Sequence, residues 1–495
     1  MVAVRIAVPA LITLCSIGTI VSRSALADSP NSTDTAISES SPPSNPNAGW
    51  LAKFWEDLAF QRKSTVGLLS VQGTSQEETK FNPTRELRIT DKSKMIYDSL
   101  SFNWHLRLHV NRNVLRKDGN IDDPYITKAL TLPNGSVLDR GYQFIVQEAY
   151  LQKSSDNYLL QIGTIAHPWV SADTINPMSV FNPQDVRLGF LGDKDLQTAP
   201  IPSARLALMD EGSTLNFVYS PWRAATLQPM RGQNWYVTPT NFTSFSIDYQ
   251  MNRQIETAQN FAIKYDTTIT SGDLSLLYYR GADYDFVGTP LGTRIENNQP
   301  LIIDIQQTTP EKTLFGASYS KTLDNWVLKA EGTYTLDKKV MPEVKIDNID
   351  NQSQVFPIAL VSSPAYQTTV GFNYFASIKS FFGIPLSETV FLAEYYRQRF
   401  LRKNLTQPFL GDLVVTGLRT TFLEGRLEAL GSYVYDAFAK GASWGGKLTF
   451  SGDDLKHSLN WQNFDGKMPE SRQIGSVFYY WRNNDLVSYD VSYQF

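Results

Sequence analysis

Hydrophobic and polar residues alternate strictly over the last nine residues of the chain. Val487, Tyr489, Val491, Tyr493 and Phe495 are apolar or aromatic, and every residue between them is polar. Successive side chains of a β-strand point to opposite faces, so this pattern predicts a strand with one apolar and one polar face.

The same alternation recurs along most of the chain. Phe102, Trp104 and Leu106 share one face of another predicted strand, for example, and Asn103 and His105 share the opposite face. The segments are roughly ten residues long, the length that a tilted transmembrane strand needs. We count eighteen of them: 64–73, 102–110, 142–153, 156–165, 201–209, 213–220, 260–269, 272–281, 312–321, 326–334, 365–376, 387–398, 412–422, 425–435, 442–451, 455–462, 473–482 and 487–495.

This periodicity predicts an all-β fold, a large antiparallel transmembrane β-barrel of about eighteen strands, within a range of 16–20. Two weaker segments, 244–252 and 300–308, would raise the number to twenty. A large soluble array of β-sandwiches is the alternative, because it would show a similar alternation.

The two ends of the chain favour the barrel. A final strand that ends on an aromatic residue resembles the assembly signal of bacterial outer-membrane barrels, with Tyr493 and Phe495 at its apolar positions. The resemblance implies two partners, the lipid bilayer of the outer membrane and the barrel assembly machinery. At the other end, Arg5, an apolar run over 6–21 and an Ala-Leu-Ala sequence at 25–27 predict a cleaved signal peptide over 1–27, and hence export to the bacterial outer membrane.

Three further regions complete the predicted organisation. Residues 28–48, rich in Ser, Pro and Asn, are typical of a disordered periplasmic leader. Residues 49–62 carry apolar side chains at helical spacing and predict a short amphipathic helix. The barrel is expected over 63–495, with a connection over 166–200 that folds into the lumen.

Composition excludes several functions. The one cysteine, Cys15, lies in the predicted signal peptide, so the mature chain would have no disulfide, thiolate metal site or haem attachment motif, and we expect no cofactor. A net charge of −4 argues against nucleic-acid binding, which needs a basic surface. Aromatic residues make up 12% of the chain, as expected for a barrel with aromatic girdles.

The predicted connections conflict with the usual arrangement of a barrel, in which the short turns are periplasmic. If Phe495 lies in the periplasm, the turn at 482–485 is extracellular. Counting strands back from there places most long connections on the periplasmic side. Either strands are misplaced or long connections fold into the lumen.

One irregular stretch carries a concentration of polar residues. Its two Asn-Pro steps disfavour a continuous strand and predict a structured loop. Folded inward, the loop would constrict a pore and set its local field; the plainer interpretation is that its Asn and Asp side chains only stabilise turns. The candidate pore residues of this loop are Asp173, Asn176, Asn182, Asp185 and Arg187.

The order of motifs around this loop resembles a known family. A strand ends at Gly163, then follow Trp169, Ala-Asp-x-x-Asn-Pro at 172–177, Asn-Pro-x-Asp at 182–185 and Pro-x-Pro at 200–202. This order resembles a porin-like family of outer-membrane barrels of unknown function, related to alginate-export-type barrels of Gram-negative bacteria. Where that family usually has Arg-Gln after the glycine, this chain has Thr164-Ile165.

Other charged residues fall on the polar faces of predicted strands. Arg107 lies between His105 and His109, and Lys329 and Glu331 share one face. We include Arg107, Lys329 and Glu331 among the candidate pore residues. The histidines would need further ligands to bind a metal ion, and the sequence identifies none. Arg419, Arg426, Glu428 and Lys447 are also expected to point inward, and their mixed signs predict either internal salt bridges or a weakly selective passage.

The expected function is a porin-like outer-membrane channel for passive or weakly selective passage of small or lipophilic solutes, with an unknown small solute as ligand. A barrel of sixteen or more strands encloses open space. One alternative is a non-conducting structural or polysaccharide-export component. A weaker alternative, an outer-membrane lipase or protease, would need a Ser-His-acid set. Its candidate histidines are His105, His109, His167 and His457.

Overall fold

The computed structural model describes most of the chain from Ala59 onward. The described residues are 59–73, 84–110, 130–131, 134–138, 142–169, 172–186, 198–223, 226, 245–250, 256–269, 272–285, 287–294, 301–342, 359–378, 380–381, 384–405, 411–467 and 476–495. The predicted signal peptide, the leader, residues 49–58 of the predicted helix, and Arg187 lie outside them.

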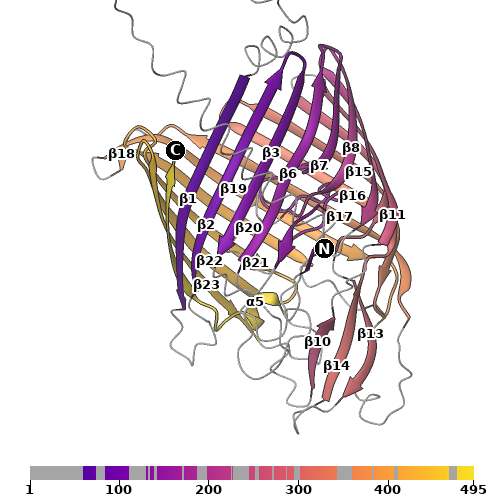
Figure 1. Cartoon of the computed structure of the whole chain (residues 1–495). Coiled ribbons are helices and arrows are strands. Elements are labelled where there is room, and N and C mark those ends of the chain that lie inside the picture. Colours follow the sequence, from indigo (N-terminus) through magenta and orange to yellow (C-terminus); the bar gives the residue numbers. More distant parts are fainter. Residues whose placement is uncertain are drawn as a thin grey trace, which may run out of the picture. The chain divides into compact units, whose positions relative to one another are not determined.

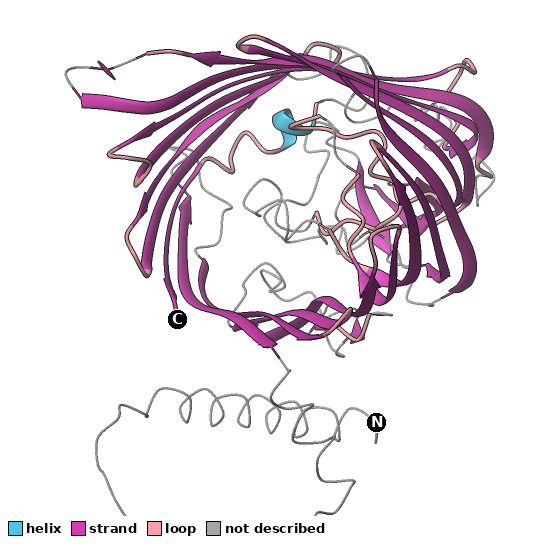
Figure 2. Cartoon of the chain, turned by 90° about the horizontal axis from the view of Figure 1, so that it is seen from above, coloured by secondary structure: helices cyan, strands magenta, loops and turns pink. Residues whose placement is uncertain are grey.

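Eighteen antiparallel strands form a closed barrel, as the sequence predicted (Figures 1 and 2). The first strand pairs with the last, from Thr65 opposite Gln494 to Gly73 opposite Leu486, so the wall has no free edge. In ring order the strands are β1 (Ala59–Gly73), β2 (Thr84–Tyr97), β3 (Leu100–Val110), β6 (Tyr142–Ser154), β7 (Tyr158–Ile165), β8 (Ile201–Asp210), β9 (Ser213–Arg223), β11 (Glu256–Ile269), β12 (Gly272–Ala282), β15 (Glu311–Leu323), β16 (Trp326–Val340), β17 (Val361–Ala376), β19 (Ile384–Phe400), β20 (Asp412–Phe422), β21 (Leu427–Asp436), β22 (Gly441–Ser451), β23 (Leu455–Gly466) and β24 (Leu486–Gln494).

The smaller elements lie in the connections. The short strands are β4 (Leu130–Thr131), β5 (Val137–Leu138) and β18 (Ser380–Phe381), and one helical turn is α5 (Val477–Tyr480). A separate sheet consists of β10 (Phe245–Gln250), β14 (Leu301–Thr308) and β13 (Val287–Arg294), in which β10 and β14 run parallel. The weak segments 244–252 and 300–308 thus contain β10 and β14, which belong to this sheet and not to the wall.

Three details of the prediction were wrong. The wall includes β2, which the sequence analysis missed because Asp91 and Ser93 interrupt the apolar face; Asp91 is bound there by Arg62 and by the Trp104 indole N–H. The predicted strand 473–482 contains α5, whose apolar side chains are buried in the interior. Residues 59–62, assigned to a helix, belong to β1.

Because 473–482 is not a wall strand, the long connections no longer fall on the same rim as the C-terminus, and the conflict noted in the sequence is resolved. The segment 467–485 becomes one long connection between β23 and β24. The long connections 111–141, 166–200, 224–255, 283–310 and 341–360 then share its rim. The opposite rim carries the short turns at 98–99, 155–157, 211–212, 324–325 and 452–454, together with the C-terminus, where the Gln494 N–H donates to the Asp454 carbonyl (2.8 Å).

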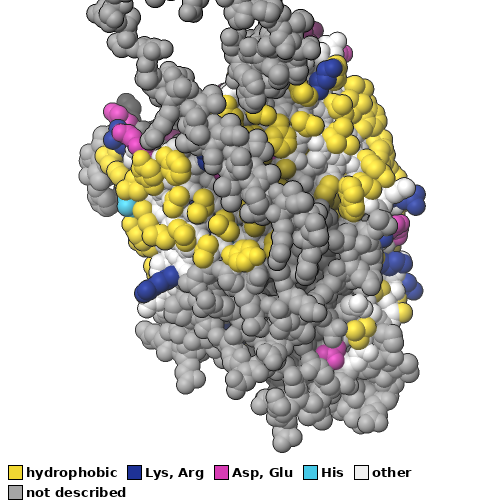
Figure 3. Space-filling model, viewed as in Figure 1, with side chains coloured by type: hydrophobic (Ala, Val, Ile, Leu, Met, Phe, Trp, Pro, Cys, Tyr) yellow, Lys and Arg dark blue, Asp and Glu magenta, His cyan; other side chains and the backbone are white. Residues whose placement is uncertain are grey.

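The wall is apolar outside and polar inside, as a bilayer requires. Leu328 and Leu448 are 43% and 40% exposed on the outer face, whereas the inward Thr333 and Thr449 are buried. Figure 3 shows apolar side chains over the wall and lysine and arginine side chains mainly at its margins. The molecule is therefore a transmembrane β-barrel.

Phe495 completes the seam between the first and last strands. Its N–H donates to the Ser64 carbonyl (3.0 Å) and its carbonyl accepts from the Ser64 N–H (3.2 Å), and its ring stacks with that of Tyr493 on the outer face. Its role as an assembly signal stays a prediction. No helix within the described residues is long and apolar enough to cross a membrane.

Candidate functional site: an interior segment anchored on the barrel wall

The connection after β7 turns inward at once and is held by Asn182. The Asn182 side chain accepts the N–H of His167 (2.8 Å) and donates to the carbonyl of Ile165 (3.3 Å). The outgoing and returning parts of the connection are thereby joined at the end of β7. Because Asn182 binds backbone groups, it acts here as a structural turn residue.

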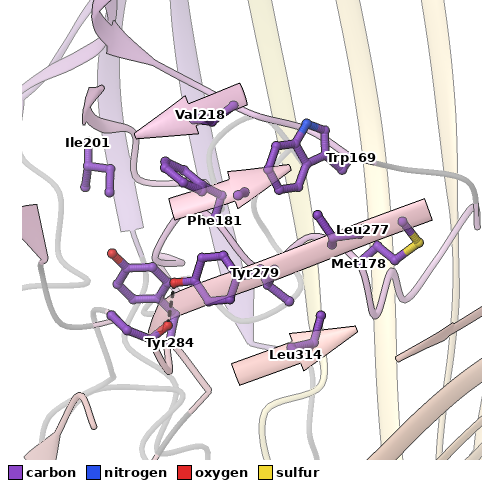
Figure 4. Close-up of a cluster of buried hydrophobic side chains, with 12 residues drawn as sticks. Trp169, Met178, Phe181, Ile201, Val218, Leu277, Tyr279, Tyr284 and Leu314 are labelled. Atoms are coloured by element: carbon purple, nitrogen blue, oxygen red, sulfur yellow. Dashed lines mark hydrogen bonds between the residues drawn. The ribbon is translucent and has the colours of Figure 1, made fainter. Parts of the chain in front are cut away.

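A buried apolar cluster holds one side of this connection. Trp169, Met178 and Phe181 of the connection pack with wall residues such as Leu277 and Tyr279 (Figure 4). The Phe181 ring makes T-shaped contacts with the rings of His167 and Trp169, with centroids 4.8 and 5.8 Å away. This part of the interior is apolar and close-packed, because the connection supplies the apolar partners of inward-facing wall residues.

Two wall carboxylates hold the other side of the connection. Glu394 on β19 accepts the backbone N–H groups of Asp173 (2.6 Å) and Thr174 (3.0 Å) and the hydroxyl of Thr174. Glu331 on β16 accepts the N–H of Met178 (2.5 Å). Both glutamates are 4% exposed. Buried carboxylates that accept backbone N–H groups make strong, charge-assisted hydrogen bonds.

A cation completes the polar attachment. Lys329 Nζ lies 2.6 Å from Oδ2 of Asp173, and the Asn373 amide donates to the same oxygen (2.9 Å). The Thr369 hydroxyl donates to the carbonyl of Ile175 (2.9 Å). Lys329 and Asp173 remain partly exposed, at 15% and 35% of their side chains, so this pair faces the open part of the interior.

The anchors lie far around the ring from the strand where the connection begins. β7 is the fifth strand of the eighteen and β19 the thirteenth, so the two are nearly opposite. The chain passes from the apolar cluster at Trp169 to Glu394 within four residues, and returns to Phe181 and Asn182. Figure 2 shows connections inside the ring of strands. We call residues 172–181 the interior segment.

The candidate residues named from sequence are distributed as follows. Asp173, Lys329 and Glu331 belong to this polar attachment. The carbonyl of Asn176 accepts the N–H of Ser179 (3.0 Å) in a turn, and Asp185 is buried.

Arg107 lies on β3, on another part of the wall, and its Nε donates to His105 (3.1 Å). The sequence analysis missed Glu394, Asn373 and Thr369. Each of the three lies on the polar face of a predicted strand, and this position is the sequence signal that could have identified it.

A second ion cluster, which sequence analysis missed, lies where the connection 283–310 leaves β12. Lys338 bridges Asp283 (2.9 Å) and Asp285 (2.6 Å), and Lys312 binds Asp283 (2.9 Å). Burial alone would raise the pKa of Asp285, but Lys338 and Lys312 lower it well below its usual range. The charges balance, so the cluster fixes the connection without adding net charge.

The histidines have structural surroundings. His167 Nε2 lies 2.9 Å from the hydroxyl of Ser203, and burial, together with Arg205, lowers the pKa of His167 to about 3. Both residues are at most 5% exposed, so no substrate can approach this Ser–His pair. His109 contacts Glu86 (2.5 Å), and His457 contacts the Tyr489 hydroxyl (2.6 Å) on the outer face. Within the described residues, no three His, Cys, Asp or Glu side chains are grouped to hold a metal ion.

Comparison with known proteins finds no matching family model and no matching curated protein. Among solved structures, the barrel is similar to OpdK of Pseudomonas aeruginosa, determined with vanillate, with a TM-score of 0.44 and 10% identity over 89% of this chain and 99% of that one. OccAB1 of Acinetobacter baumannii gives a TM-score of 0.44 and 8% identity, over 89% and 96% of the chains. An outer-membrane protein of Vibrio cholerae, OmpT with loop L8 deleted, gives 0.38 and 8%, over 89% and 100%. Similarities of this size leave the function to be argued from the geometry of this chain.

Proposed function

We propose that the protein is a porin-like channel of the outer membrane, and that the interior segment narrows its passage for small or lipophilic solutes. The observation that carries this proposal is the attachment of the segment to Glu394 on β19 and to Glu331 and Lys329 on β16, eight and six strands around the ring from β7. A chain held across the interior by buried hydrogen bonds is a fixed obstacle. A solute must pass beside it.

The size of the barrel supports a channel. Eight strands are filled by their own side chains, whereas sixteen to eighteen leave an aqueous interior. In this barrel the interior is partly filled by connections, which suits a restricted passage better than a wide pore.

The charges facing the passage support weak selectivity. Asp173 and Lys329 neutralise each other, and Arg419 on β20 binds Glu428 on β21 (2.8 Å), with half of the arginine side chain exposed. Strong preference for one ion would need one sign of charge to dominate the constriction.

Single-channel conductance in planar bilayers tests the proposal. Deleting residues 171–186 should raise the conductance, because the obstacle is removed. Asp173→Asn should lower any preference for cations, because Lys329 then loses its partner. Asp210→Asn, in an exposed turn of the opposite rim, is the matched control and should change neither property.

A folded wild-type barrel that conducts no current would contradict the proposal. It would support instead a non-conducting structural or polysaccharide-export component. Equal conductance of the wild type and a folded deletion variant would show that the segment is not the constriction.

A further inference from the structure

Cations gather on the outer face of the barrel at the rim that carries the long connections. Lys339 at the end of β16 donates to the Ser362 hydroxyl (2.6 Å), and Arg402, just after β19, donates to the Ser362 carbonyl (3.3 Å). Arg397 and Arg399 lie on β19 itself. We call Lys339, Arg397, Arg399 and Arg402 the basic rim patch; it spans the adjacent strands β16, β17, β19 and β20.

The patch faces outward, not into the interior. Tyr395 is 36% exposed on the outer wall, and its hydroxyl donates to Asp412 (2.9 Å). Arg397 and Arg399 follow Tyr395 at intervals of two residues, so they share its face. Both contact the same carboxylate, Arg397 Nε at 3.6 Å.

The patch lies at the height of the lipid headgroups. Outward-facing tyrosines, Tyr334, Tyr395 and Tyr435, are 36–42% exposed on the same strands and on β21, a few residues nearer the middle of the wall. Tyrosine and tryptophan girdles mark the membrane interface of barrels. The patch residues lie two to seven residues beyond the tyrosines of this girdle and therefore meet the polar layer of the outer leaflet.

Over the part of this rim that the structure describes, positive charge exceeds negative charge. Asp412 is shared by two arginines and is 13% exposed, whereas Arg397 keeps 44% of its side chain exposed. A second carboxylate, Asp337, points to β15 and accepts the N–H of Thr313 (2.9 Å). Arg402 is exposed at the surface. Among the described residues of the patch, four cations thus face two carboxylates that are already bound.

The opposite rim has a different character. Its short turns expose acidic side chains at successive positions around the ring. The cations of that rim, Lys153, Lys321 and Arg426, are interspersed with these carboxylates, whereas those of the basic rim patch lie together on one surface. The exposed turn residues are Asp98, Asp156, Asp210, Asp273 and Asp324.

We propose that the basic rim patch binds the phosphate groups of a phosphorylated glycolipid of the lipid A type in the outer leaflet. Arginine presents its donors in a planar fork that matches phosphate oxygens, and such charge-assisted bonds are strong. Several cations on one surface act together on an anionic lipid. The inference rests on the outer-membrane placement of the proposed function, with the long connections outside, but not on conduction.

The test measures bound lipid directly. Purified barrel in detergent is mixed with bisphosphorylated lipid A, with fully dephosphorylated lipid A, or with the bisphosphorylated form plus inorganic phosphate, and the complexes are weighed by native mass spectrometry. The variant is Lys339→Gln, Arg397→Gln and Arg402→Gln together; Arg399 is kept because it holds Asp412. Lys153→Gln, Lys321→Gln and Arg426→Gln at the opposite rim form the matched control.

The triple variant should bind bisphosphorylated lipid A between about tenfold and a hundredfold more weakly than the wild type, and the control should bind it normally. Dephosphorylated lipid A should bind the wild type as weakly as the variant, and inorganic phosphate should not displace the lipid. Equal binding by variant and wild type would overturn the proposal. Equal binding of both lipids, or displacement by inorganic phosphate, would also overturn it. Conductance of the same preparations tests the proposed function separately.

Discussion

The two sides of the wall that hold the interior segment do so by different physics. On β8 to β15, the segment is buried through apolar contacts of Trp169, Met178 and Phe181. On β16 to β19, it is bound through Glu331, Glu394 and Lys329. Apolar burial depends little on salt or charge and has no direction, whereas the carboxylates fix individual backbone N–H groups. The apolar side therefore determines whether the segment stays inside the barrel. The polar side determines where the segment lies and which charge it presents.

The largest effect is expected from the apolar side. Phe181→Ala removes a fully buried ring and should destabilise the packing of the segment by about 3–5 kcal/mol, as for other buried aromatic residues. The released segment should be cleaved faster by protease in the folded barrel. The matched control is Phe315→Ala, because Phe315 is 49% exposed on the outer face. Equal cleavage of the two variants would show that the cluster does not hold the segment.

Both kinds of contact with the interior segment require that the wall side chains involved face the interior and not the lipid. On β23, Leu459 faces outward and is 40% exposed, and its neighbour Asn460 faces inward. Leu459→Arg should destabilise the barrel by about 2–4 kcal/mol if it lies near the bilayer midplane, and Asn460→Arg by much less. Unfolding midpoints in urea, measured in lipid vesicles, provide the check. Indistinguishable midpoints would mean that the faces are wrongly assigned.

A smaller effect is expected from the polar side. Glu394→Gln keeps the shape of the side chain but removes the charge that binds two backbone N–H groups, and should cost about 1–3 kcal/mol. The segment would shift without leaving the interior, so we expect more current noise and little new cleavage. Glu428→Gln is the control, since Glu428 binds Arg419 and not the segment. Cleavage as fast as in Phe181→Ala would remove the distinction between the two sides.

The smallest effect concerns pH at the second ion cluster. Because Lys338 and Lys312 lower the pKa of Asp285 in the folded state, its ionised form stabilises the fold above the ordinary pKa of 3.8. This contribution is lost as the pH falls from there toward the lower folded-state pKa. Thermal unfolding of wild type and Asp285→Asn should therefore differ at pH 6 and converge in strong acid. A difference that grows as the pH falls would contradict the assigned direction.

The alternation of apolar and polar residues was sufficient to predict the barrel, because nearly every wall strand shows it. The prediction failed where tertiary contacts permit a different pattern. Asp91 is tolerated on the outer face of β2 because Arg62 and Trp104 bind it, and 477–479 are apolar because they fill the interior rather than face lipid.

The candidate site was only partly accessible from sequence. Alternation places Lys329 and Glu331 on a polar face, and the Asn-Pro steps indicate a structured connection. Two contacts of Asp173, its ion pair with Lys329 and its backbone N–H bond to Glu394, depend on how far the connection reaches around the ring. No local pattern encodes such a distance.

If the interior segment lines the passage, a charged group attached chemically to the segment must alter the current through the barrel. Cys15, the one cysteine of the chain, lies in the predicted signal peptide, so Asp173→Cys would introduce a single thiol in the mature protein, at a position 35% exposed. Asp210→Cys, at the exposed rim opposite the long connections, is the control. Negatively and positively charged thiosulfonate reagents, added during single-channel recording, should lower the current through Asp173→Cys in steps and shift its ion preference in opposite directions. The current through Asp210→Cys should not change. Complete labelling of Asp173→Cys, verified by mass, with unaltered current would contradict the account.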